Sequence, residues 1–330
     1  MTFLLILLNE NLENNTMHIR TNPILNKIFQ PIILFCEWLG KHHPIALAKI
    51  RYFVRFKKCL NIDNPKTLNE KILYLSLKTD TSLWTRCADK YAVRSYVEEL
   101  GLADILVPLV GVWDNVKDVD FNKLPSQFVL KTNHGCGDIV LVSDKTLLNK
   151  NDVLFHYVKG LKSKYGALES AHHYMRINPK LIAEALLYND IEERKISSSM
   201  IDYKMWCFNG KLEYIMTCAN RKVFKGHETV ELKLYDKDWN SHSEYMHYDC
   251  EHVNGREIPK PKNFDVMIRV AEKLAAPFPC VRVDLYNLSG KIYFSELTFT
   301  SYGGMMNYYT KEFQELAGDM IDLSKVKVVR

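Results

Sequence analysis

Two apolar runs of the chain flank a Ser-Gly pair: Cys280-Val281-Arg282-Val283-Asp284-Leu285-Tyr286, then Ser289-Gly290, then Ile292-Tyr293-Phe294-Ser295-Glu296-Leu297-Thr298. Both runs are rich in β-branched and aromatic residues, and the Ser-Gly pair between them is typical of a turn. The pattern therefore predicts a β-hairpin. Because successive side chains of a strand point to opposite faces, Arg282 and Asp284 share a face of the first arm, and Glu296 and Thr298 share a face of the second.

Two carboxylates, Asp284 and Glu296, interrupt the otherwise apolar arms of this hairpin. A buried carboxylate is costly unless a cation pairs with it or a metal binds it. One acid on each arm suits Mg²⁺, which takes one or two protein carboxylates and leaves its other positions to phosphate oxygens and water. A salt bridge with Arg282, or a solvated sheet face, accounts for the same pattern, and the sequence leaves these alternatives open.

A second motif, residues 128–138, joins an apolar run to a turn that contains Gly135 and Gly137. Lys131 places a positive charge at the end of the run, and the N–H groups of the turn can line phosphate oxygens. The motif is neither a Walker loop nor G-x-G-x-x-G. It indicates a phosphate-binding turn, with a tight β-turn and an exposed lysine as the alternative.

Other segments fill in a mixed pattern of helices and hairpins. Lys90 follows Asp89, a residue suited to cap the helix predicted over residues 89–100. Residues 181–187 predict an apolar strand that contains Glu184 and could offer backbone groups to an adenine ring. Lys204 stands in an aromatic run, so it is either ion-paired or functional, and the Asn209-Gly210 pair after this run predicts another hairpin. With a helix predicted over residues 264–274, the fold class is α+β.

Composition limits the classes of partner. The chain has 330 residues, 47% of them hydrophobic, and a mild net charge of +5 without a dense Lys/Arg block, which argues against a nucleic-acid partner. Its eight cysteines are scattered and form no CxxC pair. This spacing argues against a zinc ribbon or a disulfide framework and favours a cytoplasmic location.

The N-terminal region has its own pattern. Residues 3–8 are apolar but too few to span a membrane, and no charged start of a signal peptide precedes them. We expect translation to begin at Met17 and residues 1–16 to be dispensable for folding. Residues 24–60 are predicted to be helical, and the basic residues after position 40 leave open a peripheral contact with the inner face of the membrane. A solvated basic face of a helical lobe is the alternative.

Taken in order, these motifs resemble the ATP-grasp superfamily and, within it, the TupA-like branch of teichuronopeptide biosynthesis. The resemblance covers about residues 60–315. The matching stretches are residues 67–71, 89–94, 107–109, 111–114, 128–138, 182–184, 202–211, 258–261 and 278–300.

The resemblance implies two α+β lobes that grip ATP between antiparallel sheets. We expect a helical segment over residues 1–60, a first lobe over residues 61–180 and a second lobe with the metal site over residues 181–330. The roles that the family implies for individual residues are these: Lys90 and Lys131 contact the phosphates of ATP, the loop Asn133-His134-Gly135 to Gly137 covers them, and Glu184 to Leu187 form the hinge beside adenine.

The same resemblance implies that Arg282 contacts the transferring phosphoryl group, with Lys204 as a second candidate catalytic residue, and that Asp284 and Glu296 bind Mg²⁺. Thr298, the candidate third metal ligand, stands where many ATP-grasp enzymes have asparagine. Asp190 and Glu192 are the candidates for binding ribose.

The activity that the resemblance implies is ATP-dependent activation of a carboxylate and its joining to an amine, in the synthesis of a bacterial surface polysaccharide such as capsule, teichuronic acid or lipopolysaccharide. The expected partners are ATP, Mg²⁺ and a small acid and amine. A glycosyltransferase of the same pathway is the alternative, since Asp118-Val119-Asp120 and Asp236-Lys237-Asp238 are Asp-x-Asp pairs. A non-catalytic nucleotide-binding subunit is a third reading.

Overall fold

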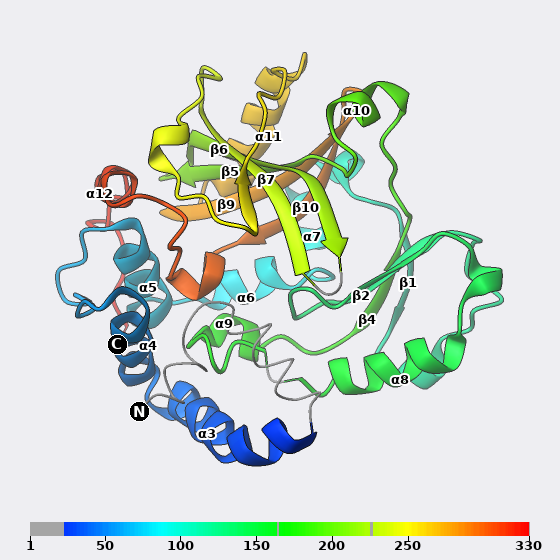
Figure 1. Ribbon diagram of the computed structural model, residues 1–330, viewed down its shortest axis with the longest axis horizontal. Helices are drawn as coiled ribbons and strands as arrows, with labels where there is room; N and C mark the ends of the chain where they lie inside the picture. Colours follow the sequence, from blue (N-terminus) through cyan, green and yellow to red (C-terminus); the bar gives the residue numbers. More distant parts are fainter. Residues whose placement is uncertain (1–22, 164, 225–226, 330) are drawn as a thin grey trace.

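The computed structural model describes residues 23–163, 165–224 and 227–329. Within these ranges the chain forms two β-sheets flanked by helices, in two lobes with separate hydrophobic cores (Figure 1). The predicted α+β class is confirmed. The expected leader over residues 1–16 and the start at Met17 lie outside the described residues.

The larger sheet has the strand order β10-β9-β5-β6-β7-β8 and is antiparallel except for the β7–β8 pair. Its strands are β5 (Asp202–Phe208), β6 (Lys211–Phe224), β7 (His227–Asp236), β8 (His252–Asn254), β9 (Cys280–Leu288) and β10 (Lys291–Thr298). Both predicted hairpins are present. Asn209 and Gly210 turn between β5 and β6 with φ of 49° and 78°, the left-handed pair that matches the twist of the flanking strands.

The smaller sheet has the order β1-β4-β2-β3. Its strands are β1 (Leu109–Trp113), β2 (Phe128–Thr132), β3 (Ile139–Val142) and β4 (Leu181–Glu184). The expected lobe boundary after residue 180 is therefore misplaced, because β4 pairs with both β1 and β2 and belongs to the first lobe.

Helices cover the sheets. The helix α5 (Leu68–Lys78) begins at a capping box formed by Thr67 and Glu70, and α12 (Lys311–Asp319) packs beside it. The predicted helix over residues 264–274 is α11 (Phe264–Ala275), which packs on β9, β5 and β6. The other helical segments are α6 (Ser82–Ala88), α8 (Lys150–Gly160), α9 (His172–Met175), α10 (Ile191–Ile196), η1 (Ala103–Ile105), η2 (Val116–Asp118), η3 (Lys145–Leu147), η4 (Ser243–Tyr245) and η5 (Ser301–Gly304).

The helix predicted over residues 89–100 is shorter than expected and forms α7 (Val93–Glu99). The Asp89 carboxylate accepts the backbone N–H groups of Tyr91 and Ala92, so residues 89–92 form a turn that comes before the helix. Asp89 thus shapes the turn that carries Lys90.

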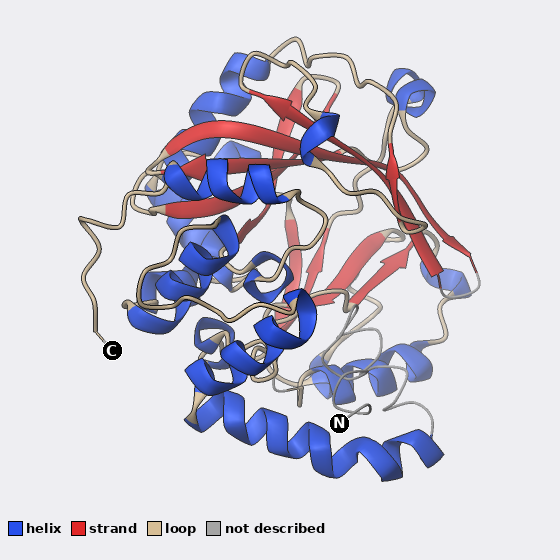
Figure 2. Ribbon diagram, turned by 60° about the vertical axis from the view of Figure 1, so that its left-hand side comes forward, coloured by secondary structure: helices blue, strands red, loops and turns tan. Residues whose placement is uncertain are grey.

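Two helices, α3 (Pro23–His42) and α4 (Pro44–Phe56), confirm the predicted helical segment. The helix α3 runs along the lower edge of the molecule in Figures 1 and 2, and α4 lies at the lower left of Figure 1. They pack together through a cluster that includes Cys36, Leu47 and Val54. Across the described ranges, none of the helices combines the length and the apolar character needed to cross a membrane.

Candidate active site

The two carboxylates of the β9–β10 hairpin face each other. Asp284 and Glu296 are register partners on adjacent antiparallel strands, and Arg282 and Thr298 are partners at the neighbouring position. Asp284 is fully buried, whereas the Glu296 side chain is 35% exposed. The hairpin therefore brings both acids, the arginine and the threonine into one cluster, because a β-bulge between Phe294 and Glu296 turns Glu296 and Thr298 to the face of Asp284 and Arg282.

Arg282 holds Asp284 in a two-pronged salt bridge. Its Nε donates to Oδ1 and its Nη2 donates to Oδ2, both at 2.7 Å. Its other contacts are the hydroxyls of Thr298, at 3.1 Å, and Ser301. Burial lowers the pKa of Arg282, but the adjacent Asp284 more than offsets this and leaves the pKa well above its usual value. The salt bridge that the sequence left open is thus present for Asp284.

Lys204 extends this cluster onto β5, where it is the register partner of Asp284. Its Nζ lies 2.9 Å from Asp284 Oδ2 and 2.5 Å from Asp202 Oδ2. The second oxygen of Asp202, Oδ1, is buried without a hydrogen-bond partner among the described residues. Asp202 was missed as a site residue. Its signal is its place two residues before Lys204, on the same face of the same strand.

Glu296 is the more accessible acid of the pair. Its Oε1 accepts from the Thr298 hydroxyl at 3.2 Å, and Lys90 and Arg282 lie at 3.8 and 3.7 Å from its oxygens. Burial would raise the pKa of Glu296, but Lys90, Lys204 and Arg282 together lower it to about 2. Glu296 is therefore an ionised carboxylate with free acceptor positions.

The smaller sheet supplies a second charged group. Lys131 Nζ on β2 lies 2.5 Å from Glu184 Oε2 on β4, and Arg94 Nη1 lies 3.6 Å from the other Glu184 oxygen. Register places Ile139 and Leu141 of β3 on the same sheet face as Lys131, and these two side chains are 50% and 68% exposed. This face combines an exposed apolar surface with an ion pair.

The glycine loop after β2 is anchored at its base by Asn133. The Asn133 side chain is fully buried, donates to Asp89 Oδ1 at 2.8 Å and accepts from the backbone N–H of Lys180 at 2.6 Å. His134 is also buried, and burial lowers its pKa. The Asn133 side chain is thus used inside the protein, and its backbone is paired as well, since its N–H donates to the Lys180 carbonyl and its carbonyl accepts from the Lys90 N–H.

The exposed part of the loop lies around Gly135 and Gly137. Lys90 Nζ donates to the Gly135 carbonyl at 2.5 Å, so Lys90 touches this loop as well as approaching Glu296. Gly137 has φ of 74° with open space around it. The structure therefore brings Lys90, the glycine loop and the carboxylate cluster together, while Lys131 and Glu184 form their own pair on the smaller sheet.

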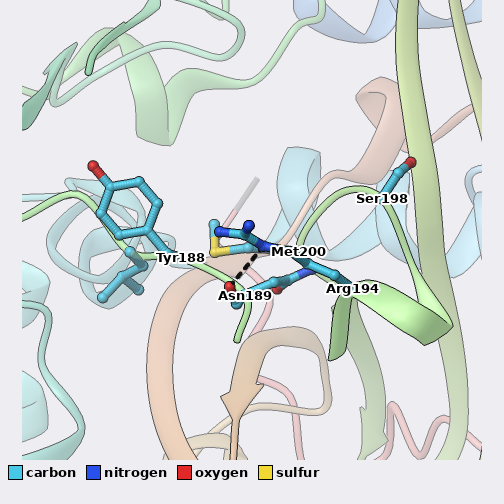
Figure 3. A pocket seen from close by; sticks show the side chains of 6 residues that line it. Tyr188, Asn189, Arg194, Ser198 and Met200 are labelled. Carbon is cyan, nitrogen blue, oxygen red and sulfur yellow. Dashed lines mark hydrogen bonds between the residues drawn. The ribbon is translucent and has the colours of Figure 1, made fainter. Parts of the chain in front are cut away.

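The segment after β4, which was predicted to form the hinge beside adenine, borders a cavity of about 390 Å³ (Figure 3). Its lining residues are Leu187, Tyr188, Asn189, Arg194, Ser198 and Met200. Arg194 Nε donates to the Asn189 carbonyl at 3.1 Å.

Both candidate ribose acids are engaged elsewhere. Asp190 caps α10 by accepting from the Glu193 N–H and also bonds Ser289, and Glu192 pairs with Lys195 on the surface. Their carboxylates would have to exchange these contacts to bind ribose.

The residues fit a magnesium ion that is shared with phosphate. Among the described residues no group of three or more His, Cys, Asp or Glu side chains is placed to hold a metal. Two carboxylates, Asp284 and Glu296, and the Thr298 hydroxyl form an oxygen donor set, and Asp202 Oδ1 nearby lacks a partner. Mg²⁺ is characteristically bound through one or two carboxylates plus phosphate oxygens, so this set suits it.

The structure has two mostly antiparallel sheets, and Lys90 contacts residues of both lobes. Lysines, an arginine and paired acids line the site between them. This combination is that of the class of ATP-grasp proteins. The profile of one protein family, described as TupA-like ATPgrasp, matches residues 70–322. The chain belongs to the TupA-like ATP-grasp family, and its ATP-grasp fold follows. No curated protein sequence matches the chain.

Solved structures of ligases resemble the fold at low identity. The chain is similar to the D-alanine–D-alanine ligase of Bacillus anthracis, with 14% identity, a TM-score of 0.43, and coverage of 74% of this chain and 68% of that one. The VanG D-Ala:D-Ser ligase of Enterococcus faecalis has 14% identity and a TM-score of 0.42, with coverage of 74% of this chain and 63% of that one. The phosphoribosylamine–glycine ligase of Thermotoga maritima has 9% identity and a TM-score of 0.36, with coverage of 67% of this chain and 49% of that one. The chain therefore spans about half to two thirds of the length of these proteins.

Proposed function

We propose that the protein is an ATP- and magnesium-dependent ligase that activates a carboxylate and joins it to an amine. The observation that carries the proposal is the register pair Asp284 and Glu296 with Arg282 beside it, connected through Lys90 to the glycine loop after β2. This is an acid pair for a metal, set among cations suited to phosphate.

In this proposal Lys90 and Lys131 bind the phosphates of ATP, together with the N–H groups around Gly135 and Gly137. The base lies against the apolar face of Ile139 and Leu141, near the hinge at Leu187. Asp284, Glu296 and the Thr298 hydroxyl would hold Mg²⁺, which neutralises phosphate charge when bound.

The chemistry needs no nucleophile from the protein. A substrate carboxylate oxygen attacks the γ-phosphorus of ATP, the bond to the β–γ bridging oxygen breaks, and ADP leaves. An amine then attacks the carbonyl carbon of the resulting acylphosphate, phosphate leaves, and the amide forms as the nitrogen loses a proton. Arg282, buried and fixed by Asp284, offers the second N–H of its Nη1 to the transferring phosphoryl group, while Lys204 keeps Asp284 and Asp202 in place.

The pathway is the finer part of the proposal. We place the reaction in the synthesis of a bacterial surface polysaccharide, where the acid or the amine sits on a sugar or on an amino acid joined to it. The enzyme then works in the cytoplasm, which makes ATP and keeps thiols reduced, or at the inner face of the membrane.

The glycosyltransferase alternative would use an Asp-x-Asp pair. The Asp236 carboxylate accepts from Asp238 and Asn240 in a surface turn, and Asp118 lies on η2. These contacts give the pairs a local role in turns, and no observation here favours a glycosyltransferase site over the carboxylate cluster.

Nucleotide choice tests the proposal. The melting temperature of the full chain should rise with magnesium-ATP and stay unchanged with a uridine-diphosphate sugar, because binding to the native state stabilises it. A rise with the sugar nucleotide alone would support a glycosyltransferase, and no rise with either would reject nucleotide chemistry at this site. Mass spectrometry of the surface polysaccharide from a deletion strain should then show the loss of an amide-linked group.

A further inference from the structure

The excess positive charge of the chain is concentrated around α3 and α4. Residues 23–58 contain seven Lys or Arg residues and one acidic residue, Glu37, which gives this segment a net charge of +6. The whole chain carries +5, so all other residues together sum to −1. A partner that recognises this segment by charge is therefore anionic.

The same segment exposes an apolar stripe on α3. Leu34, Phe35 and Trp38 are 52%, 57% and 49% exposed, and their spacing of three and four residues places them on one side of the helix. The Phe35 and Trp38 rings stack with centroids 6.1 Å apart. Cys36, between them in the sequence, is buried against α4, so the stripe faces away from the packed side of α3.

The helix α4 has the same combination of exposed apolar side chains and lysines. On α4, Ile50 and Phe53 are exposed beside Lys49, and Lys57 and Lys58 are exposed directly after the helix. Leu47 and Val54 point to the buried side. Exposed aromatic and aliphatic side chains thus lie beside exposed lysines, which are Lys41 at the end of α3 and Lys49, Lys57 and Lys58 on and after α4.

We propose that this α3–α4 surface, formed by Leu34, Phe35, Trp38, Ile50 and Phe53 with Lys41, Lys49, Lys57 and Lys58, docks the protein onto a membrane rich in anionic phospholipid. The apolar side chains enter the boundary between headgroups and acyl chains, and the lysines meet lipid phosphates. The contact is peripheral.

The residues of this surface precede, in the sequence, the segment that holds the candidate ATP site. The family match begins at residue 70, after both helices, and every candidate site residue lies within it. Figure 2 shows α3 at the lower edge of the molecule, below the sheets. The inference therefore goes beyond the proposed ligase chemistry and does not depend on it.

Two other occupants fit less well. A nucleic acid would use the lysines but would leave Leu34, Phe35 and Trp38 in water. A second copy of the chain would bring one segment of charge +6 against another, and like charges across an interface repel. An anionic lipid surface satisfies both the charge and the apolar side chains.

Vesicle sedimentation tests the proposal with the full chain. Vesicles of phosphatidylcholine alone are compared with an equal mixture of phosphatidylcholine and phosphatidylglycerol, and the protein should sediment with the mixture only. Phe35→Ser combined with Trp38→Ser should lower partitioning roughly tenfold or more. Changing Lys49, Lys57 and Lys58 to Gln should lower it by about fivefold for each lysine.

Phe155→Ser is the matched control. Phe155 is 63% exposed on α8 and is not part of the α3–α4 surface, so this variant should partition like the wild type. All variants should keep the wild-type melting temperature and ATP affinity, which separates a failed membrane contact from a failed ligase proposal.

Several outcomes would overturn the membrane proposal. The first is wild-type protein that binds both kinds of vesicle equally or neither. Another is a Phe35/Trp38 variant that still binds the anionic vesicles, or a dimer in solution that this variant breaks. The last is binding to a single-stranded RNA probe that the lysine variant loses and the Phe35/Trp38 variant keeps.

Discussion

Arg282 and Asp284 stand two residues apart on one strand and form a buried salt bridge with both arginine prongs at 2.7 Å. Burial raises the pKa of the Asp284 carboxyl, while Arg282 and Lys204 oppose that rise. Glu296, its partner across the hairpin, has one side-chain hydrogen bond among the described residues and a pKa of about 2. The two acids of the proposed metal site therefore differ in how much they contribute to the stability of the folded protein.

The first prediction concerns Asp284→Asn. Because this change leaves Arg282 and Lys204 buried with one fewer negative partner, the free energy of unfolding should fall by about 3–5 kcal/mol. Urea denaturation of the protein without nucleotide measures it. A variant as stable as the wild type would show that the salt bridge contributes nothing to folding.

The second prediction concerns Glu296→Gln. The side chain is about one-third exposed and its nearest cations lie at 3.7 and 3.8 Å, so the free energy of unfolding should change by less than about 1 kcal/mol. Turnover should be lost, and magnesium should no longer strengthen ATP binding in calorimetry. A full magnesium effect in this variant would remove Glu296 from the metal site.

The third prediction concerns Lys131→Ala. Loss of a charge-assisted contact to phosphate should raise the Kd for ATP roughly ten- to a hundredfold. Within the described ranges Glu184 then keeps Arg94 as its one cation, which adds negative charge near the phosphates. Lys180, whose side chain pairs with the exposed Asp114, provides the control, and the Lys180→Ala variant should bind ATP normally. Equal affinity in both variants would contradict the role of Lys131.

The fourth prediction concerns the pH dependence of stability. His173 on α9 is fully buried against Trp84 and Phe299, its ring nitrogens have no partner among the described residues, and burial lowers its pKa to about 3. Below pH 6.5 the unfolded chain takes up a proton that the folded chain refuses, so stability falls with pH from about 6.5 towards 3. Between pH 7 and pH 5 this group should account for about 2 kcal/mol.

His173→Phe provides the comparison for that prediction. The variant keeps an aromatic ring against Trp84 but cannot titrate, so its unfolding free energy should fall less between pH 7 and pH 5. Urea denaturation at both pH values measures the difference. Parallel losses in the two proteins would mean that other groups govern acid sensitivity.

The sequence predicted the strands and hairpins well because their turns are local. Asn209-Gly210 and Ser289-Gly290 both adopt the left-handed backbone that such pairs favour, and this sets the register of the arms on either side. A β-bulge between Phe294 and Glu296 then brings Asp284 opposite Glu296. Without this extra residue Ser295 would face Asp284, so alternation alone does not predict the acid pair.

Contacts between segments distant in sequence could not be predicted in the same way. The pairing of Lys131 with Glu184, 53 positions later, depends on β4 lying beside β2, and no local signal specifies which strands become neighbours. The Asn133 side chain was expected at the phosphates, yet it is buried in contacts with Asp89 and Lys180. An amide that completes a turn looks the same in sequence as one that binds a ligand.

Lys90 donates to the Gly135 carbonyl of one lobe and lies 3.8 Å from Glu296 of the other. An ammonium group has three N–H donors, so a phosphate that takes more than one of them replaces one of these contacts. The measured affinity for a nucleotide is then a difference between two sets of contacts to one nitrogen. Weaker contacts of Lys90 with Gly135 and Glu296, rather than a better contact with phosphate, would be one route to tighter binding of the nucleotide.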